Sequence, residues 1–427
     1  MNLVSGWRAI SERVSFAYRN RIAFLVLMAA AVVFKLSAAA LVPSSFELQE
    51  IMAMAIGRLD RGGPWIAVEK GVLLLWMSLT SSTNVPVNWW KAAAFVNPNG
   101  ELSLLLVLTR LPAFLIDVAT LVVLYVAVRD SSSVERARLA GLVWFLNPYT
   151  IFAVELLAVP DILAVFFTLV ATLLVLYRRF FLSGAILAAG VAVKLYPILL
   201  VPVFLIICLP EVRKTWLLTI SYALFIGLGL FGYFNWAAGA LPLTALINYS
   251  PIIQPMTSIF NILPGARISL VTVALVVTYV ATYLGTRSRQ PHLAIAVLAT
   301  ILIYFTFSDP YPQYFLWPLP FLIFDLAYSK GRGVFLAGLL ALQLSDWFFL
   351  SHGFLTPSGY SMLLFGLRGQ NLPAYCLSIS SFLNQYADFA VLVVSTLLYA
   401  LTLIYSLDVM RRWFAVPGSA DHPSRGM

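Results

Sequence analysis

Long apolar runs separated by short polar breaks make up most of this chain. The runs lie near residues 21–41, 103–128, 139–157, 160–177, 180–209, 215–234, 267–285, 292–308, 313–328, 333–350 and 388–410. One bilayer crossing needs ~20 apolar residues, so most runs have the length of a single crossing helix. Inside lipid, every backbone polar group must find its partner within the protein, and a helix provides that. The pattern predicts an all-α polytopic membrane protein, a bundle of about 11–13 membrane helices.

The composition agrees with that class, and the charge distribution orients it. The chain of 427 residues is 61% hydrophobic and 11% charged, with a mean hydropathy of +0.91 and a net charge of +9. Basic residues gather in alternate gaps between the runs, at 8–21, 129–138, 178–179, 213–214, 287–289, 330–332 and 411–412. Cytoplasmic loops carry such an excess of Lys and Arg, which predicts a multi-pass cell-membrane protein with both termini in the cytoplasm. The positive charge is thus a topology signal, and we expect membrane lipids rather than nucleic acid as partners.

The apolar pattern predicts one domain. We expect a cytoplasmic N-terminus over 1–20, a single transmembrane domain over 21–410 and a cytoplasmic tail over 411–427. Residues 42–102 form a long first external loop, whose own apolar piece at 72–79 is too short to cross. The three histidines and two cysteines lack metal-ligand spacing, so we expect no metal and no cofactor. Because the expected cytoplasmic ends are short, we expect any chemistry to take place in the membrane or on its external side.

Lys194 is a positive charge inside the apolar run 180–209. It lies in the segment Gly190-Val-Ala-Val-Lys-Leu-Tyr-Pro197, and basic pairs flank both ends of the run. The run is too long for one crossing and too short for two, and its flanks predict that the chain leaves and returns on the cytoplasmic side. We predict two short helices broken near Tyr196 and Pro197, with Lys194 close to the external face. A charge at a broken membrane helix predicts a polar ligand.

Glu47 and Glu50 follow the first apolar run. Pro43 ends that helix, and the serines after it can cap a new one, which puts both carboxylates on one face. A partly desolvated carboxylate at a membrane surface suits a general base that takes a proton from a hydroxyl. On spacing alone, two solvated loop acids beside basic residues of the same loop explain the pattern better.

Arg110 and Asp117 lie inside the second run. Arg110 is within two turns of the outer end and can face an anion, whereas Asp117 lies deeper and needs a partner. The two residues could instead pair and lock two helices together.

Glu155 and Asp161 are expected in the external hairpin between the third and fourth runs. Asp161 follows a proline at the start of a helix, where the helix dipole favours its charge and capping alone accounts for it. Trp144 and Tyr149 in the third run are expected to be membrane-belt aromatics.

A proline-punctuated segment, Asp309-Pro-Tyr-Pro-Gln-Tyr-Phe-Leu-Trp-Pro-Leu-Pro320, opens a later run. Gln313 and Tyr314 are predicted to point into the bundle near Lys194. An amide and a phenol beside an ammonium suit a sugar or a phosphate. A proline-rich turn with belt aromatics fits the same composition.

Three of these features, taken in order, resemble a known family. The acidic first external loop, the Lys194-Leu-Tyr-Pro197 break and the Gln313-Tyr-Phe-Leu-Trp317 segment are similar to those of integral-membrane GT-C glycosyltransferases. The similarity is to prokaryotic polyprenol-phosphate-mannose-dependent mannosyltransferases and to the first mannosyltransferase of GPI-anchor assembly. It covers roughly residues 20–330.

The resemblance implies a GT-C-like bundle that transfers a hexose, with mannose favoured, from a polyprenyl-phosphate donor to a lipid-linked or glycolipid acceptor. Transfer would invert the sugar carbon on the extracytoplasmic side. The family places an acidic base, usually Asp, just after the first span, where this chain has Glu47, with Glu50 as the second candidate. The implied substrate-binding residues are Tyr196, Gln313, Tyr314 and Asp161; the family has Gly-Gln before the matching Asp, where this chain has Val159-Pro160. A small membrane subunit is a further candidate partner.

The chemistry gives Lys194 and Arg110 a role in binding the donor phosphate. Negative charge grows on the phosphate as the sugar leaves, so a fixed cation stabilises the transition state more than the ground state without needing a metal. The chain has no Gly-rich phosphate loop, which favours a lipid-linked donor over a nucleotide sugar.

Two other classes stay open. Broken helices that carry charges are also typical of secondary transporters or lipid flippases. The clustering of polar residues on the external side and the lack of a repeat relating the two halves favour the enzyme. A non-catalytic subunit of a glycosylation complex is the third interpretation, because Glu47 replaces the usual Asp.

Overall fold

A computed structural model describes most of the predicted bundle. The described residues are 20–41, 64–80, 100–156, 158–208, 215–237, 259–263, 266–288, 293–307 and 312–328, with single positions between 397 and 411. The helices are α2 (Arg21–Leu41), α4 (Pro64–Thr80), α6 (Gly100–Ser131), α7 (Val134–Phe145), α8 (Pro148–Thr150), the π-helix η1 (Ile151–Leu156), α9 (Asp161–Leu176), α10 (Phe180–Val193), the 3₁₀-helix η2 (Tyr196–Leu200), α11 (Val201–Cys208), α12 (Thr215–Ala237), α14 (Leu270–Ser288), α15 (Leu293–Phe307), the 3₁₀-helix η4 (Pro312–Leu316) and α16 (Leu319–Tyr328). An antiparallel hairpin of β1 (Ile259–Leu263) and β2 (Ala266–Ser269) precedes α14.

Apart from the β1–β2 hairpin, the helical class predicted from the apolar runs is confirmed for these residues, with fewer full-length spans. Two helices, Arg21–Ala39 and Leu104–Ser131, are long and apolar enough to cross a membrane. The pair Val134–Phe145 and Pro148–Glu155, bent by 43°, adds a third if it forms one span. Other described helices, such as those at 161–176, 180–193 and 293–306, are apolar but shorter. The predicted run 333–350, and all but single positions of 388–410, lie outside the described residues.

Prolines explain why some predicted spans are broken. The run 139–157, predicted as one helix, is instead α7, α8 and η1, because Asn147 turns out of the helical conformation and Pro148 starts the next element. The Asn147 side chain caps α8 by accepting from the backbone N–H of Tyr149. The run 313–328 is likewise divided into η4 and α16 on either side of Pro318.

The break predicted inside 180–209 is confirmed. Helix α10 ends at Val193, and Lys194 follows in an extended conformation with φ −149° and ψ 144°. The backbone N–H of Lys194 still donates to the carbonyl of Gly190, and the chain then turns into η2, which has Pro197 near its start. A proline disfavours a continuous helix through the residue before it, which accounts for the break.

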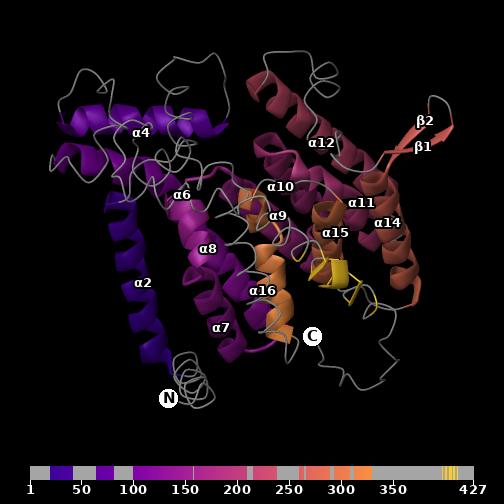
Figure 1. The fold of residues 1–427 in the computed structure, drawn as a ribbon, viewed down its shortest axis with the longest axis horizontal. Coiled ribbons are helices and arrows are strands. Elements are labelled where there is room, and N and C mark those ends of the chain that lie inside the picture. The colour runs from indigo at the N-terminus through magenta and orange to yellow at the C-terminus, as the bar shows by residue number, and fades with distance from the viewer. Residues whose placement is uncertain are drawn as a thin grey trace, which may run out of the picture.

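The first long helix presents a narrow inward face. Ala31, Lys35 and Ala39, spaced four residues apart, are its buried side chains, whereas Val26 and Phe34 are exposed apolar residues on other faces. A surface helix of a soluble protein would carry polar groups there. The exposed apolar faces of α2 are therefore suited to lipid. Figure 1 shows α2 upright at one side of the bundle.

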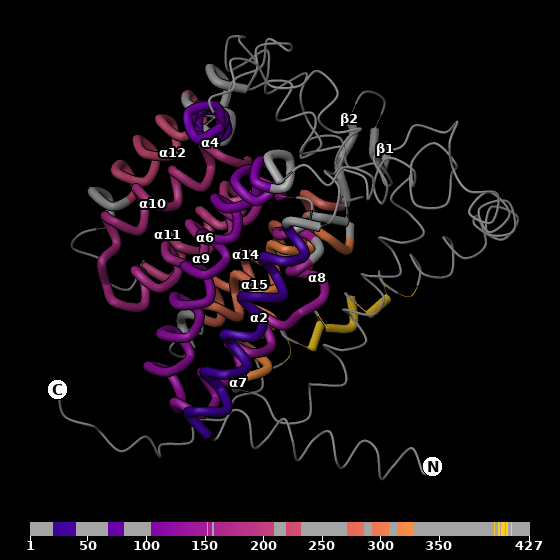
Figure 2. The backbone as a smooth tube through the Cα atoms, turned by 90° about the vertical axis from the view of Figure 1, so that its left-hand side faces the viewer, coloured from indigo at the N-terminus to yellow at the C-terminus, as the bar shows by residue number. Residues whose placement is uncertain are grey.

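Helix α4, inside the predicted first external loop, lies across the bundle. Figure 1 shows it crossing the upper end of α2 and α6, and Figure 2 shows it end-on at the same end of the molecule. Glu69, Leu73 and Trp76, at helical spacing, form its buried face. Its exposed residues include Val68 and Leu75, which gives this crosswise helix an apolar outer surface.

The carboxyl group of Glu69 should make stability depend on pH. Burial raises the pKa of Glu69 from 4.5 to about 8. Between those values the folded protein binds more protons than the unfolded chain, so the free energy of unfolding falls as pH rises, by up to about 1.4 kcal/mol per pH unit. We expect the melting temperature in detergent to fall between about pH 5 and pH 8 and the Glu69→Gln protein to lack this part of the slope. Equal slopes in both proteins would contradict the burial of an ionisable Glu69.

Helices α10 and α12 pack at very close range. A Cβ on Gly184 would lie only 2.9 Å from the ring of Tyr222. The hydroxyl of Tyr222 donates to Ser183 Oγ at 2.9 Å. A Cβ on Gly229 would lie 2.5 Å from the carbonyl oxygen of Ala188. Small residues at such a crossing let two backbones approach, as in other membrane helix pairs.

A pair of glycine variants tests this packing. Gly229→Ala is expected to lower the free energy of unfolding by about 1–3 kcal/mol, because the new methyl meets backbone that cannot move aside. Gly227→Ala is the matched control, since a Cβ there meets nothing within 4 Å. Both changes improve helix propensity equally, so the difference between their melting temperatures isolates the contact. Equal stability of the two variants would show that α10 and α12 are further apart.

Candidate functional site

The broken helix brings Lys194 to residues from two other parts of the chain, the start of α9 and the η4 segment. Its Nζ lies 3.2 Å from Asp161 Oδ2 and 4.6 Å from the centre of the Tyr314 ring. The side chain of Lys194 is 27% exposed, whereas that of Asp161 is 3% exposed. The ammonium thus lies at the boundary of the cluster, held by a buried carboxylate and the face of a phenol.

Asp161 is fixed by two donors. It is the first residue of α9, as predicted, with Pro160 before it. Its Oδ2 accepts from Lys194, and its Oδ1 accepts from the indole N–H of Trp317 at 2.8 Å. From sequence, a helix-capping role was sufficient to explain Asp161. In the structure its carboxylate also connects α9 to the α10–η2 break and to Trp317 after η4. The position of Lys194 therefore depends on Asp161.

Aromatic rings form a stack beside the ion pair. The Trp317 ring lies parallel to that of Tyr196, with centroids 3.9 Å apart, and to that of Tyr314 at 4.4 Å. The hydroxyl of Tyr196 lies 3.1 Å from that of Thr168 on α9. Tyr196 and Trp317 are buried, while Tyr314 is half-buried at the end of the stack nearest to Lys194. We call Lys194, Asp161, Tyr196, Tyr314 and Trp317 the Lys194 cluster.

The other predicted site residues fall elsewhere. Glu47 and Glu50 lie outside the described residues. Gln313 belongs to η4 by its backbone, but its side chain is outside the described part of the structure. Of the predicted site residues, Lys194, Tyr196, Tyr314 and Asp161 are therefore the ones brought together. Trp317, which closes the cluster, was part of the sequence motif but was given no role.

Arg110 lies in a second group of charges, which is buried inside the bundle. It is buried, and its guanidinium donates to the carbonyl oxygen of Ala39, in the last turn of α2. A cation there interacts favourably with the carbonyl end of the helix dipole. Arg110 lines a crevice together with Lys35 and Glu155. Its role on the donor phosphate stays a prediction.

Lys35 was missed by sequence reasoning. Its Nζ lies 2.6 Å from Asp117 Oδ2 and 3.0 Å from Glu155 Oε1, and all three side chains are at most 1% exposed. Its ammonium also lies 4.2 Å from the centre of the Phe145 ring. Asp117 thus pairs with Lys35, and the Arg110–Asp117 pair considered from sequence is not the ion pair that forms. A lysine inside an apolar run was the available signal, the same one that identified Lys194.

The predicted membrane-belt aromatics are interior residues. Trp144 and Tyr149 are fully buried. The indole N–H of Trp144 donates to Asp117 Oδ1 at 2.8 Å, and the Tyr149 ring meets Phe315 of η4 edge-on at 6.1 Å. Both rings pack inside the bundle, and the indole N–H of Trp144 finds a buried acceptor there.

The two charge groups are joined by a short stretch of unusual backbone. Glu155 lies in the π-helix η1, and Ala158 after it has a positive φ of 54°. Single π-turns and left-handed non-glycine residues cost energy and recur at functional sites. This stretch leads directly to Asp161, so one connector carries an acid of each group.

Among the described residues, no set of three or more His, Cys, Asp or Glu side chains is placed to hold a metal ion. The Lys194 cluster offers one cation, one carboxylate and an aromatic face. An ammonium with a carboxylate and stacked rings suits a ligand with an anionic group beside a polar ring.

The fold and this cluster define a helical protein with apolar helices compatible with a membrane, in which charged groups converge at helix breaks. No family model matches the sequence, and no curated protein matches it. The resemblance to GT-C enzymes therefore rests on the residues of this chain.

Proposed function

We propose that this chain is a membrane glycosyltransferase that moves a hexose, with mannose favoured, from a polyprenyl-phosphate donor to a lipid-linked or glycolipid acceptor. The observation that carries the proposal is Lys194 at the α10–η2 break. Its side chain is 27% exposed while its partner Asp161 is buried. Membrane charges at broken helices are costly and serve ligands or ion pathways.

The ion pair supports binding of a phosphate. Asp161 keeps the ammonium in one position and is itself fixed by Trp317, so the cation is ordered before a ligand arrives. A preorganised cation stabilises charge that develops on a leaving phosphate. An ammonium has three N–H donors. That of Lys194 can contact phosphate oxygens from its exposed side while its buried side donates to Asp161.

The aromatic stack supports a sugar or prenyl contact next to that phosphate. The Tyr314 ring is the member of the stack that contacts the ammonium of Lys194. The Trp317 ring packs against Tyr314, and Tyr196 packs against Trp317. A flat aromatic face next to a cation fits the two halves of a sugar phosphate. Glu47 is the proposed base and Glu50 its alternative.

A transporter or flippase is the second candidate, and one observation favours it. Lys35, Asp117 and Glu155 meet deep among the helices, where a transferase with an external site has no evident use for them. Buried ionisable groups of this kind mark ion pathways in transporters. A non-catalytic subunit of a glycosylation complex has no specific support among the described residues.

Sugar transfer by the purified protein tests the proposal. The detergent-solubilised chain would receive radiolabelled polyprenyl-phosphate-mannose or, separately, a nucleotide-linked mannose, each with membrane glycolipids as acceptors. Labelled glycolipid is expected from the lipid-linked donor alone. Absence of product from a panel of polyprenyl-phosphate sugars would contradict the proposal and favour the transporter.

The role of Glu47 is tested in the same assay. Glu47→Gln keeps the shape of the side chain but removes the base, so transfer is expected to fall by roughly 10²–10⁴-fold. Glu50→Gln is the matched comparison. Unchanged transfer by Glu47→Gln together with loss in Glu50→Gln would move the base to Glu50.

A further inference from the structure

A buried group of charges inside the bundle is not used by the proposed reaction. Lys35 on α2 contacts Asp117 on α6 at 2.6 Å and Glu155 on η1 at 3.0 Å. The three residues come from elements far apart in sequence and are almost fully inaccessible. Charges removed from water in this way persist only when paired and hydrogen-bonded.

The charges of this triad do not balance if all three groups are ionised. One ammonium then faces two carboxylates. Asp117 is satisfied on both oxygens, by Lys35 and by the indole of Trp144. Glu155 uses Oε1 for Lys35, but its buried Oε2 finds no hydrogen-bond partner among the described residues. The surplus negative charge therefore falls on Glu155.

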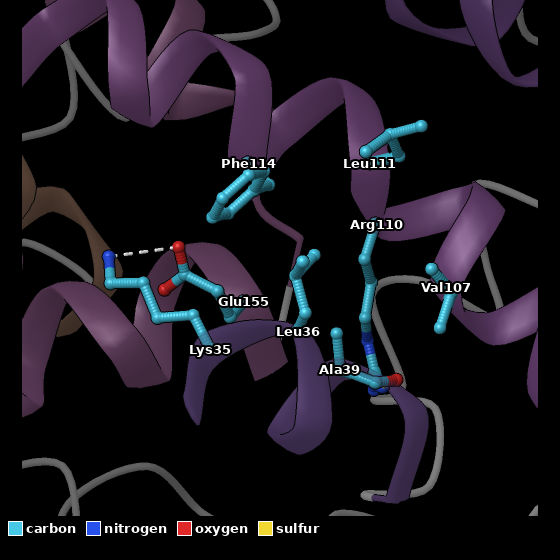
Figure 3. Close-up of a pocket in the computed structure, with 8 residues that line it drawn as sticks. All are labelled: Lys35, Leu36, Ala39, Val107, Arg110, Leu111, Phe114 and Glu155. Atoms are coloured by element: carbon cyan, nitrogen blue, oxygen red, sulfur yellow. Dashed lines mark hydrogen bonds and ion pairs between the residues drawn. The ribbon is translucent and has the colours of Figure 1, made fainter. Parts of the chain in front are cut away.

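Within the described elements packed against η1, no second cation reaches the carboxylate of Glu155. Of the elements packed against η1, α2 contributes Lys35, and α6 contributes Asp117 and Arg110. Figure 3 shows the Glu155 carboxyl turned to Lys35, while the Arg110 guanidinium points away to Ala39. Helix α8, which also packs against η1, contributes the titratable side chain of Tyr149, whose ring packs against Phe315.

The space beside Glu155 limits what could neutralise it. Lys35, Arg110 and Glu155 line a crevice whose other walls are apolar, among them Leu36 and Phe114 (Figure 3). The crevice is too narrow to admit a water molecule in this structure. A hydrated cation or an organic ligand does not fit there, whereas a proton needs no such volume.

We propose that Lys35, Asp117 and Glu155 form a proton-binding site in which the Glu155 carboxyl holds the proton. The triad is then neutral: Lys35 is cationic, Asp117 anionic and Glu155 a carboxylic acid that accepts from Lys35 through Oε1. Loss of the proton leaves a net negative charge in the apolar interior. Glu155 lies on a π-turn, a feature that recurs where a helix carries a functional group. This site is independent of the function proposed for the Lys194 cluster.

Infrared spectroscopy of the whole protein in lipid tests this assignment. A protonated carboxyl and a carboxylate absorb at different frequencies, and the protonated form shifts in D₂O. All spectra would use the Glu69→Gln background, because the pKa of Glu69, raised to about 8 by burial, leaves that carboxyl protonated at neutral pH. At pH 7, adding Glu155→Gln is expected to remove one protonated-carboxyl band and no carboxylate band.

The controls separate this outcome from misfolding. Glu135→Gln, an exposed residue at the start of α7, should remove a carboxylate band instead. Glu155→Asp, which keeps the acid, should shift the protonated band rather than abolish it. If Glu155→Gln removes a carboxylate band at pH 7, Glu155 is ionised and the proposal is overturned.

Discussion

Replacing Lys194 with alanine is expected to lower sugar turnover by roughly 10²–10³-fold, the usual effect of removing one group that stabilises a transition-state charge. The ammonium is the described cation nearest the proposed sugar site, and Asp161 and Tyr314 fix its position. Because the effect arises in the transition state, the turnover number should fall more than the apparent donor affinity. Turnover would be measured with polyprenyl-phosphate-mannose under saturating acceptor.

Lys194→Ala also removes the ion-pair partner of the buried Asp161 carboxylate, so a control must separate loss of stability from loss of catalysis. Lys194→Ala leaves Asp161 without its ion pair and should lower the melting temperature. Lys194→Ala combined with Asp161→Asn removes the uncompensated charge, so stability should recover while turnover stays low. Arg179→Ala, an exposed cation at the other end of α10, should match the unmodified protein. Recovery of turnover in the double variant would show that Lys194 acts only through folding.

The largest effect on stability is expected from Lys35→Met. Methionine has a similar length but no charge, so Asp117 and Glu155 would face each other without the ammonium. Breaking a buried pair by removing one partner costs about 3–5 kcal/mol. Thermal unfolding in detergent would show a correspondingly lower melting temperature. Lys70→Met on the exposed face of α4 is the matched control and should change little.

A second substitution tests where the remaining charge lies. Lys35→Met with Asp117→Asn removes both charges of the close pair, and most of the lost stability should return, since neutral replacements of buried pairs are tolerated. A protein with Lys35→Met alone that is as stable as the unmodified chain would contradict the buried triad.

Local sequence signals predicted the break at Lys194 well. Pro197 and the charge itself mark the point where α10 must end, and both act on neighbouring residues. Asp161 was correctly expected at a helix start for the same reason. Its contact with Lys194 joins residues on different helices, which no spacing along the chain reveals. The position of Tyr314 beside Lys194 was predicted from the similar depth expected for the two segments, at the outer end of the bundle.

The interior charge group shows what such reasoning misses. Lys35, Asp117 and Glu155 are far apart along the chain, and their pairing depends on how α2, α6 and η1 pack. Sequence reasoning instead considered a pair between Asp117 and Arg110, which lie about two helical turns apart on the same run. The π-helix that turns Glu155 inward has no sequence signature. Prolines also divided apolar runs that looked like complete spans, as at Pro148.

Binding of a short-chain polyprenyl phosphate tests the central claim most directly. Phosphorus NMR would follow the phosphate of that ligand as protein is added, with the matching polyprenyl alcohol as a competitor that lacks the phosphate. We expect saturable binding by the unmodified chain, at least tenfold weaker binding by the stable Lys194→Ala and Asp161→Asn double variant, and no displacement by the alcohol at equal concentration. Equal affinity of the two proteins would contradict the assignment of Lys194 to the phosphate of a lipid-linked sugar.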